Sequence, residues 1–379
     1  MQEENLDFLI AATPENVYYA GAFQSLSQWL IRGPRTPVVV IFDSAGNLTL
    51  VGPAGELDRA ACNPPAVDRI IAFDSVTIEL GERSTWCAED ERYAAMAIAG
   101  ERPETVWDAF RQLDLHRAGK VAIDDPDLNM EFSSRFGIKT VDGRPLWQNT
   151  RLIKTPAEVS IIRRTVDITE TAFRKSINSL QPGLSEREFQ EIFEAELLSA
   201  GGRPWLSVIG FGTFSAYPNH VPGDYCLKKN DLIRLDIGCE YKGYVSDIAR
   251  VACMGPASDF QYRRWHAILS GQQAALEVIK PGIPTAEVYR IGMEAVRRNG
   301  LSEIQRKHIG HGVGIDMYEL PSISPNDSHI LESGMVFELE VLFYELGFGA
   351  LQVEDTIHVT DDGYERITTL PQQLYIIEP

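Results

Sequence analysis

Four carboxylates and one histidine lie inside apolar or glycine-rich runs in the second half of the chain. They are Asp236, Asp247, His311, Glu340 and Glu354. Acidic residues are disfavoured within β-strands, and a carboxylate that is buried without a partner is very costly. Several of them in one sheet therefore imply cations between them. This requirement constrains the fold of the chain more than any other feature of the sequence.

The carboxylates occur in runs that read as strands. Asp236 ends the run LIRLDIG, and Asp247 follows 11 residues later in YVSDIARVACM. Two strands joined by a turn at residues 241–243 would bring these two carboxylates together. Glu340 shares one face of its strand with Glu338, because side chains alternate along a strand.

His311 lies between two glycines in HIGHGVG, and Glu354 lies in the apolar run LQVEDTIHV. Each residue by itself has an ordinary interpretation, since a single Asp is more often a turn or cap residue and a single His is more often structural. As a set, hard oxygen donors with one imidazole suit two divalent ions that share carboxylates. Such a pair activates water and stabilises a tetrahedral intermediate. The set therefore predicts a hydrolytic metal centre.

Length and charge exclude several other classes of protein. A chain of 379 residues is too long for one ordinary core, so two domains are expected. The net charge of −19 argues against nucleic acid or an anionic membrane surface as partner. There is no apolar run of ~18 residues and no basic region at the N-terminus, so we expect neither a membrane span nor a signal peptide. The five cysteines form no CxxC pair, which favours free thiols and a cytoplasmic location.

Hydrophobic periodicity predicts an α/β domain over residues 1–153. A turn is expected at residues 43–47, where Gly46-Asn47 is a hairpin signal. The predicted strands are 7–12, 16–21, 36–42, 47–52, 67–73 and 119–125, and the predicted helices are 56–61, 103–113 and 127–136.

Residues 154–379 predict a second domain of the α+β class. Apolar residues at helical spacing indicate a helix over 157–180, which Thr155 and Pro156 would begin. A second helix begins at Ser185, with Glu188 completing a capping box. The remaining predicted elements are strands within 205–254, helices at 258–278 and 285–299, and strands at 334–345 and 350–360.

The blocks DIGCEYKGYVSDIAR, GHGVG, GMVFELE and VEDT follow one another with metal-site intervals of 11, 29 and 14 residues. These blocks resemble the signatures of the prolidase, aminopeptidase P and creatinase superfamily, whose catalytic domain has the pita-bread fold. The resemblance extends over the whole chain and is nearest to Xaa-Pro dipeptidases. It implies that Asp236 binds one metal ion, that His311 and Glu340 bind another, and that Asp247 and Glu354 bridge them.

The residues expected around the substrate differ from the family pattern. A family His precedes the first metal Asp, and here Asn219 stands at its place, with His220 one residue later. Tyr318 replaces the second family His, and Gln352 replaces an Arg that binds the substrate carboxylate in prolidases. Gln cannot form the bidentate clamp of Arg. These changes motivate an alternative, in which the scaffold serves a non-peptide enzyme such as a hydrolase of a small C–N compound or a metal-assisted lyase.

Further candidates lie near these motifs. Asp316 is close to His311 in sequence and is a candidate for a base or a substrate-binding residue, and His308 begins the same motif. Trp29, Arg32 and Arg35 occupy a loop that related dimers send into the neighbouring active site, so a homodimer is expected.

The sequence thus predicts a two-domain metallohydrolase of the Xaa-Pro dipeptidase type. A metal-bridging hydroxide would cleave an amide bond of a small peptide or small molecule. Glu340, or a bridging carboxylate, would transfer the proton, and Asn219, His220 and Tyr318 are the further catalytic candidates. Gln352, Asp316, Trp29 and Arg32 are the substrate-binding candidates. The expected cofactor is a pair of divalent ions, Mn(II) first, with Zn(II), Co(II) or Fe(II) as alternatives.

Overall fold

The computed structural model describes residues 1, 4–30 and 37–378, and these residues form two compact units, Met1–Gln148 and Asn149–Pro379. The division falls inside helix α7 (Arg144–Leu152), a few residues before the boundary expected after residue 153. No helix within the described residues has the length and apolar character needed to cross a membrane. All five cysteines are free thiols, as the sequence predicted.

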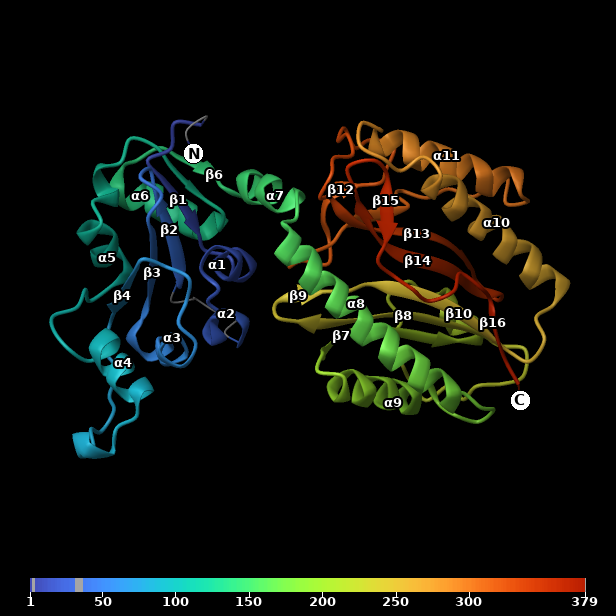
Figure 1. Ribbon diagram of the computed structural model, residues 1–379, viewed down its shortest axis with the longest axis horizontal. Coiled ribbons are helices and arrows are strands. Elements are labelled where there is room, and N and C mark those ends of the chain that lie inside the picture. The colour runs from blue at the N-terminus through green and yellow to red at the C-terminus, as the bar shows by residue number, and fades with distance from the viewer. Residues whose placement is uncertain (2–3, 31–36, 379) are drawn as a thin grey trace. The chain divides into compact units, whose positions relative to one another are not determined.

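The first unit is built on one mixed sheet with the strand order β4-β3-β2-β1-β5-β6 (Figure 1). Strand β1 pairs antiparallel with β2 and parallel with β5, so the sheet combines a meander with crossover connections. The strands are β1 (Phe8–Ala11), β2 (Val39–Asp43), β3 (Leu48–Pro53), β4 (Arg69–Phe73), β5 (Val121–Ile123) and β6 (Thr140–Asp142).

Alternating residues of these strands enter two separate cores, one on each face of the sheet. In β2, Val39 and Ile41 belong to one core, whereas Val40 and the preceding Val38 belong to the other. Strands that are covered on both faces read as continuous apolar runs, which explains the sequence PVVVIF. The helices of this unit are α1 (Pro14–Gly21), α2 (Leu26–Leu30), α3 (Asp58–Cys62), α4 (Ala88–Ala97), α5 (Val106–Gln112) and α6 (Pro126–Phe136).

The strand predicted at residues 16–21 is wrong, because this segment belongs to helix α1. Pro14 provides the fixed φ of a first helical turn. The buried carboxylate of Asp124 accepts hydrogen bonds from the backbone N–H of Ala12 (2.6 Å) and from Asn16 Nδ2 (2.7 Å), which fixes the start of the helix. A contact across more than 100 residues thus overrides the local β propensity. The predicted turn at residues 43–47 is present and joins β2 to β3.

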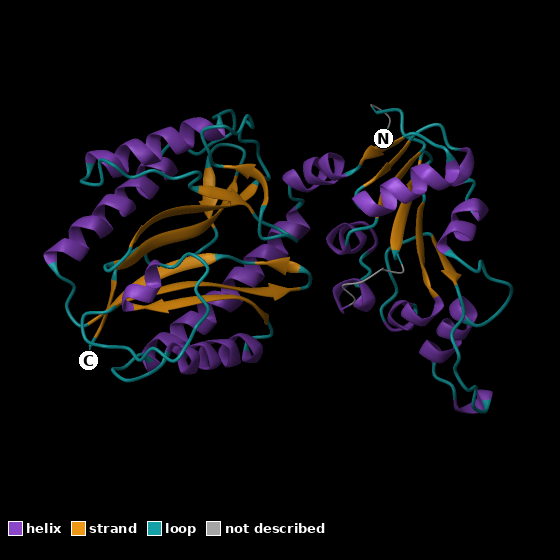
Figure 2. Ribbon diagram, turned by 180° about the vertical axis from the view of Figure 1, so that it is seen from behind, coloured by secondary structure: helices purple, strands orange, loops and turns teal. Residues whose placement is uncertain are grey.

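The second unit contains two sheets, each covered by a pair of helices (Figures 1 and 2). Helices α8 (Pro156–Ser176) and α9 (Glu186–Ser199) pack on the sheet β16-β10-β8-β7, and α10 (Asp259–Leu276) and α11 (Thr285–Arg298) pack on the sheet β12-β11-β13-β14-β15. The strands are β7 (Arg203–Phe211), β8 (Leu232–Tyr241), β9 (Tyr244–Val245), β10 (Ile248–Met254), β11 (Gly310–Gly312), β12 (Glu319–Ser322), β13 (Val336–Glu345), β14 (Gly349–Val359), β15 (Tyr364–Arg366) and β16 (Tyr375–Ile377).

The predicted helix starts of this unit are confirmed. Thr155 and Glu158 form a capping box at the start of α8, and Ser185 and Glu188 form one at the start of α9. Each box satisfies backbone N–H groups that have no partner within the helix.

A glycine allows the chain to approach β8 closely next to Asp236. A Cβ atom at Gly238 would lie 1.9 Å from the carbonyl oxygen of Ser246, so no larger residue fits without movement of the backbone. The residue after Ser246 is Asp247. This contact therefore brings the segment that carries Asp247 against the strand that carries Asp236.

Candidate metal centre

Four strands and one short connection carry the five predicted metal ligands. Asp236 lies on β8, His311 on β11, Glu340 on β13 and Glu354 on β14. Asp247 was expected within a strand but lies in the connection between β9 and β10, directly before Ile248.

The sheet register places these residues next to one another. Glu340 is paired directly with Glu354, and His311 with Glu338, in antiparallel ladders. Directly opposed residues on one face have Cβ atoms roughly 4.5–5.5 Å apart. β14 also contacts β10 and β8 of the other sheet. The carboxylates of two sheets therefore meet in the space between them.

The tightest group consists of Asp247, His311 and Glu354. One ligand atom of each lies within 4.8 Å of the others, and all three residues are buried. His311 Nε2 lies 3.9 Å from Asp247 Oδ2. His311 Nδ1 lies 3.2 Å from the carbonyl oxygen of Gly312, which orients the ring so that Nε2 faces the carboxylates.

The pKa values in this group show that the buried carboxylates resist ionisation when no cation lies between them. Burial, followed by the charges of Asp236 and Glu338, raises the pKa of Asp247 well above its usual range. Burial and the neighbouring Asp247 act in the same way on the pKa of Glu354. Burial together with the charge of Asp236 raises the pKa of Glu340 to about 7.

The residues fit a divalent metal ion. Asp247 Oδ1 is buried and has no hydrogen-bond partner among the described residues. Burial lowers the pKa of His311 to about 4, so the imidazole is neutral at pH 7 and free to donate a lone pair. Carboxylate oxygens and one imidazole nitrogen suit ions such as Mn(II). Asp236, Asp247, His311, Glu340 and Glu354 are the residues that would hold such ions.

Gln352 is buried at the centre instead of lining an open subsite. Its Nε2 donates to Asp236 Oδ2 (3.4 Å) and to Glu354 Oε2 (3.3 Å). The amide therefore joins the carboxylates of the two sheets. A substrate contact by Gln352 stays a prediction.

Glu338 also belongs to this acidic group, although it was left outside the predicted ligand set. It is fully buried, and its Oε1 accepts a hydrogen bond from Thr356 Oγ1 (3.0 Å). Its Oε2 has no partner among the residues that the structure describes. The alternation of side chains along VFELE indicated that Glu338 belongs to the group, since Glu338 and Glu340 share one face of the strand.

Two aromatic side chains lie over the edge of the centre. The ring of Tyr318 stacks on His311 with centroids 3.9 Å apart, and Tyr318 is 64 % exposed. His308 Nδ1 lies 3.2 Å from Glu340 Oε1. Partial burial and the charges of Glu340 and Asp247 raise the pKa of Tyr318, so its hydroxyl remains a donor at neutral pH.

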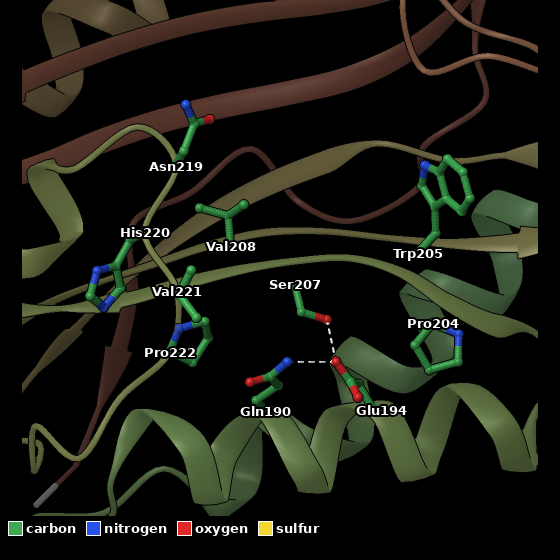
Figure 3. Close-up of a pocket in the computed structure, with 10 residues that line it drawn as sticks. All are labelled: Gln190, Glu194, Pro204, Trp205, Ser207, Val208, Asn219, His220, Val221 and Pro222. Atoms are coloured by element: carbon green, nitrogen blue, oxygen red, sulfur yellow. Dashed lines mark hydrogen bonds between the residues drawn. The ribbon is translucent and has the colours of Figure 1, made fainter. Parts of the chain in front are cut away.

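Asn219 and His220 point to different sides of their loop (Figure 3). His220 Nε2 is hydrogen-bonded to the buried carboxylate of Glu186 at 2.8 Å, and its ring stacks on Phe214. Glu186 also accepts from the backbone N–H of Phe211 and of Gly223, so this interaction holds the loop. A catalytic role for His220 was left open by the sequence. The structure gives the ring a partner away from the ligand set.

Asn219 is exposed and lines a surface pocket of about 310 Å³ together with Trp205, Ser207 and Pro222 (Figure 3). None of the five predicted metal ligands lines this pocket. Asn219 thus remains available to contact a bound molecule.

The remaining predicted site residues are Asp316, Trp29, Arg32 and Arg35. Asp316 accepts a hydrogen bond from Arg151 Nη2 (2.8 Å). Trp29 lies on α2, and its side chain is outside the described part of the structure. Arg32 and Arg35 lie outside the described residues altogether.

A buried ion pair that was not predicted supports the centre from the opposite face of β14. Arg250 donates to Asp355 Oδ1 (2.6 Å) and to the carbonyl oxygen of Glu354 (2.6 Å). Its other donors reach the carbonyl oxygens of Ala249, Leu370 and Pro371. All five N–H groups of the guanidinium are therefore used. Arg250 fixes the backbone of the residue that carries one predicted ligand.

The sequence of the second unit identifies the family. Residues 160–361 match the model of Metallopeptidase family M24. The chain belongs to this family. This result agrees with the ligand chemistry above and confirms the resemblance to prolidase and aminopeptidase P.

Curated relatives of this M24 chain are named as peptidases. An Xaa-Pro dipeptidase of Pyrococcus furiosus is 31% identical over 229 residues, which cover 60% of this chain and 66% of the relative. The uncharacterized peptidase YqhT of Bacillus subtilis is 31% identical over 232 residues, covering 61% and 66%. The matches thus span just under two thirds of the length of these relatives.

Solved structures share the fold over nearly the whole chain. The prolidase of Pyrococcus horikoshii OT3 has a TM-score of 0.82 at 24% identity, covering 99% of this chain and 97% of that one. An Xaa-Pro dipeptidase from Bacillus anthracis has a TM-score of 0.79 at 22% identity, covering 99% and 96%. The predicted fold class, an α/β domain followed by an α+β pita-bread domain, is confirmed.

Proposed function

We propose that this M24 metallopeptidase hydrolyses short peptides with proline in the second position, as an Xaa-Pro dipeptidase. The observation that carries the proposal is the buried group of Asp247, His311 and Glu354, with ligand atoms within 4.8 Å of one another. The named activity of the Pyrococcus relative, at 31% identity, supports the substrate class.

The proposed cofactor is a pair of divalent ions, with Mn(II) as first choice. Asp236 would bind one ion, His311 and Glu340 the other, and Asp247 and Glu354 both. Bound ions would supply Lewis acidity and would lower the pKa of water. The raised pKa values of the three buried carboxylates Asp247, Glu340 and Glu354 support this assignment, because cations would relieve their repulsion.

Glu340 is the proposed proton carrier. A general acid–base group must lie within hydrogen-bond reach of the reacting atoms, and Glu340 is buried at the centre, directly opposite Glu354. We infer that the carboxylate of Glu340 accepts a proton from the attacking water and passes it to the leaving nitrogen.

Tyr318 and Asn219 are the proposed donors around the substrate. The hydroxyl of Tyr318 stays protonated beside His311, and the amide of Asn219 is exposed on its loop. Loss of one oxyanion donor typically lowers the rate about 10²–10³-fold. Because Tyr318 and Asn219 are both hydrogen-bond donors, the chain can still support a peptidase reaction although both family histidines are replaced.

A panel of Xaa-Pro and Xaa-Ala dipeptides, assayed with Mn(II), Zn(II) and Co(II), tests the proposal. Asp247→Asn is the matched negative control, because it keeps the shape of the side chain and removes one ligand charge. Metal-dependent release of proline that is lost in D247N is expected. Bound metal without turnover of any dipeptide would count against the function.

The non-peptide alternative is not favoured, since the relatives described above are named as peptidases. It would regain weight only if small amides, and no peptides, were hydrolysed. A homodimer and a cytoplasmic location remain part of the proposal, and light scattering on the purified protein tests the dimer.

A further inference from the structure

Arg306 lies beside the metal centre in the segment that precedes β11. In the β11–β13 ladder Gly310 is opposite Leu339, and the N–H of Glu340 donates to the carbonyl oxygen of Ile309. In an antiparallel pair, one step back along one chain matches one step forward along the other. The segment before β11 therefore runs along β13 from Glu340 toward its C-terminal end.

The side chains confirm this path. The guanidinium carbon of Arg306 lies 5.5 Å from the centroid of the Tyr344 ring. Tyr344 and Glu340 are four residues apart on β13 and share one face of the strand. Arg306 thus lies on the side of the sheet that carries the metal ligand Glu340.

A second guanidinium holds the same ring. Arg234 lies 5.0 Å from the Tyr344 centroid and donates from Nη1 to its hydroxyl at 2.6 Å. It is fully buried on β8, two residues before Asp236, and its Nη1 lies 4.0 Å from Asp236 Oδ2. Its Nη2 donates to the carbonyl oxygens of Tyr217 and Pro218. Tyr344 is therefore fixed between two cations, and the inner cation adjoins the ligand set.

Arg306 has no ion-pair partner among the described residues, since no carboxylate of theirs lies within 4.0 Å of its guanidinium. Its Nε is buried without a hydrogen-bond partner among the same residues. The chain has 54 acidic and 35 basic residues, and other arginines of this unit, such as Arg250 and Arg264, form ion pairs.

The chemistry selects a carboxylate as the missing partner. Arginine presents paired donors that match a carboxylate, and an aromatic ring behind the guanidinium orients it. Gln352, at the position of the family arginine, has its amide donors on Asp236 and Glu354. Arg306 stands five residues before the predicted ligand His311, and the ring that it contacts lies on β13, the strand of the predicted ligand Glu340.

We propose that Arg306, supported by Tyr344 and Arg234, binds the C-terminal carboxylate of the peptide substrate and so determines the preference for short peptides with a free C-terminus. This inference rests on the proposed function for the identity of the substrate. It assigns specificity to a residue outside the predicted ligand and substrate-binding sets.

The test compares acid and amide forms of one ligand. Hydrolysis of Ala-Pro and Ala-Pro amide, and calorimetric binding of proline and proline amide, are measured on metal-loaded wild type, Arg306→Met, Arg306→Lys and Arg263→Met. Methionine keeps the apolar stem against Tyr344 and removes the charge. Arg263→Met changes the net charge equally at an exposed position on α10, where Nε donates to the carbonyl oxygen of Asp259.

Wild type is expected to prefer the acid in both assays. R306M should lower the acid-to-amide ratio by about 10–100-fold, the loss of one charge-assisted interaction, whereas R306K should retain part of the ratio and R263M all of it. Circular dichroism and metal content must match wild type, and R306K replaces R306M if the latter does not fold.

An unchanged acid-to-amide ratio in R306M, or a wild type that binds neither proline nor its amide, would overturn the inference. Failure of the proposed function has a different signature. It would appear as absence of turnover with every peptide, while R306M still loses acid-selective binding, and that result would support the subsite.

Discussion

The buried Arg250–Asp355 ion pair makes a quantitative prediction about the scaffold behind the centre. Both side chains are at most 1 % exposed, and their nearest atoms are 2.6 Å apart. Arg250→Met would leave a buried carboxylate and four carbonyl oxygens without this donor. Removal of one partner from such a pair typically costs ~3–5 kcal/mol. Asp355 keeps Gln272 and Gln372 as donors, which places the expected cost at the lower end of this range.

The assay is urea unfolding of the metal-free protein, followed by circular dichroism. The two units are fitted as separate transitions, because a chain with two domains does not have to unfold in one step. The matched control is Arg163→Met, which breaks the ion pair with Glu365 between side chains that are 46% and 44% exposed. An exposed pair of this kind contributes only ~0–1 kcal/mol.

The variant R250M should therefore lose about 3 kcal/mol in the transition of the second unit, and R163M less than 1 kcal/mol. The double variant R250M/D355L should recover part of the loss, since an apolar pair leaves no buried charge. Equal losses of unfolding free energy in R250M and R163M would refute the argument that burial and full hydrogen bonding make the Arg250–Asp355 pair strongly stabilising.

Three further outcomes are expected. Chelation of the metal should lower the midpoint of thermal unfolding, because a ligand at 100 times its dissociation constant stabilises the folded state by about 2.7 kcal/mol. An unchanged midpoint after verified removal of the metal would contradict metal binding by the folded centre. In the metal-free protein the folded-state pKa of Glu340 is raised from 4.5 to about 7. The protonated carboxyl group of Glu340 therefore stabilises the folded state fully below pH 4.5. This stabilisation is lost as the pH rises toward 7. The total loss is roughly 3 kcal/mol, because each pH unit between the two pKa values contributes 1.36 kcal/mol. Stability should consequently fall between pH 5 and 7.5 in wild type and fall less in Glu340→Gln. Finally, Gly238→Ala should weaken metal binding in titration calorimetry. The new Cβ atom would lie 1.9 Å from the carbonyl oxygen of Ser246 and would displace the neighbouring Asp247. An unchanged metal affinity would show that the segment with Ser246 and Asp247 moves without cost.

Local signals in the sequence determined most elements of the second unit. The cap at Thr155 with Pro156 and the capping box of Ser185 with Glu188 marked two helix starts, because the groups involved lie within three residues of each other. Alternation in VFELEVLF marked a strand and placed two glutamates on one face. The spacing of the acidic residues in apolar runs also led to the family, since burying carboxylates requires compensation wherever they lie in the fold.

Orientation and partners were decided by the tertiary structure. Sequence alone left Asn219 and His220 equivalent, and only the fold shows that Glu186, 34 residues away from His220, holds the His220 ring. In the same way α1 forms where a strand was expected, because Asp124 in a distant loop accepts hydrogen bonds from the backbone N–H of Ala12 and from the Asn16 side chain.

The arginines around Tyr344 show the same division. Arg234 lies within the strand run LIRLDIG, and Arg306 lies outside the motifs of the predicted centre. Only the folded chain brings the guanidinium of Arg234, from β8, and that of Arg306, from the segment before β11, to the ring of Tyr344 on β13. The sequence by itself determined which chemical groups the centre contains, because their chemistry is local. The folded chain decided which of them face one another, because distances between residues that are far apart in sequence arise only from packing.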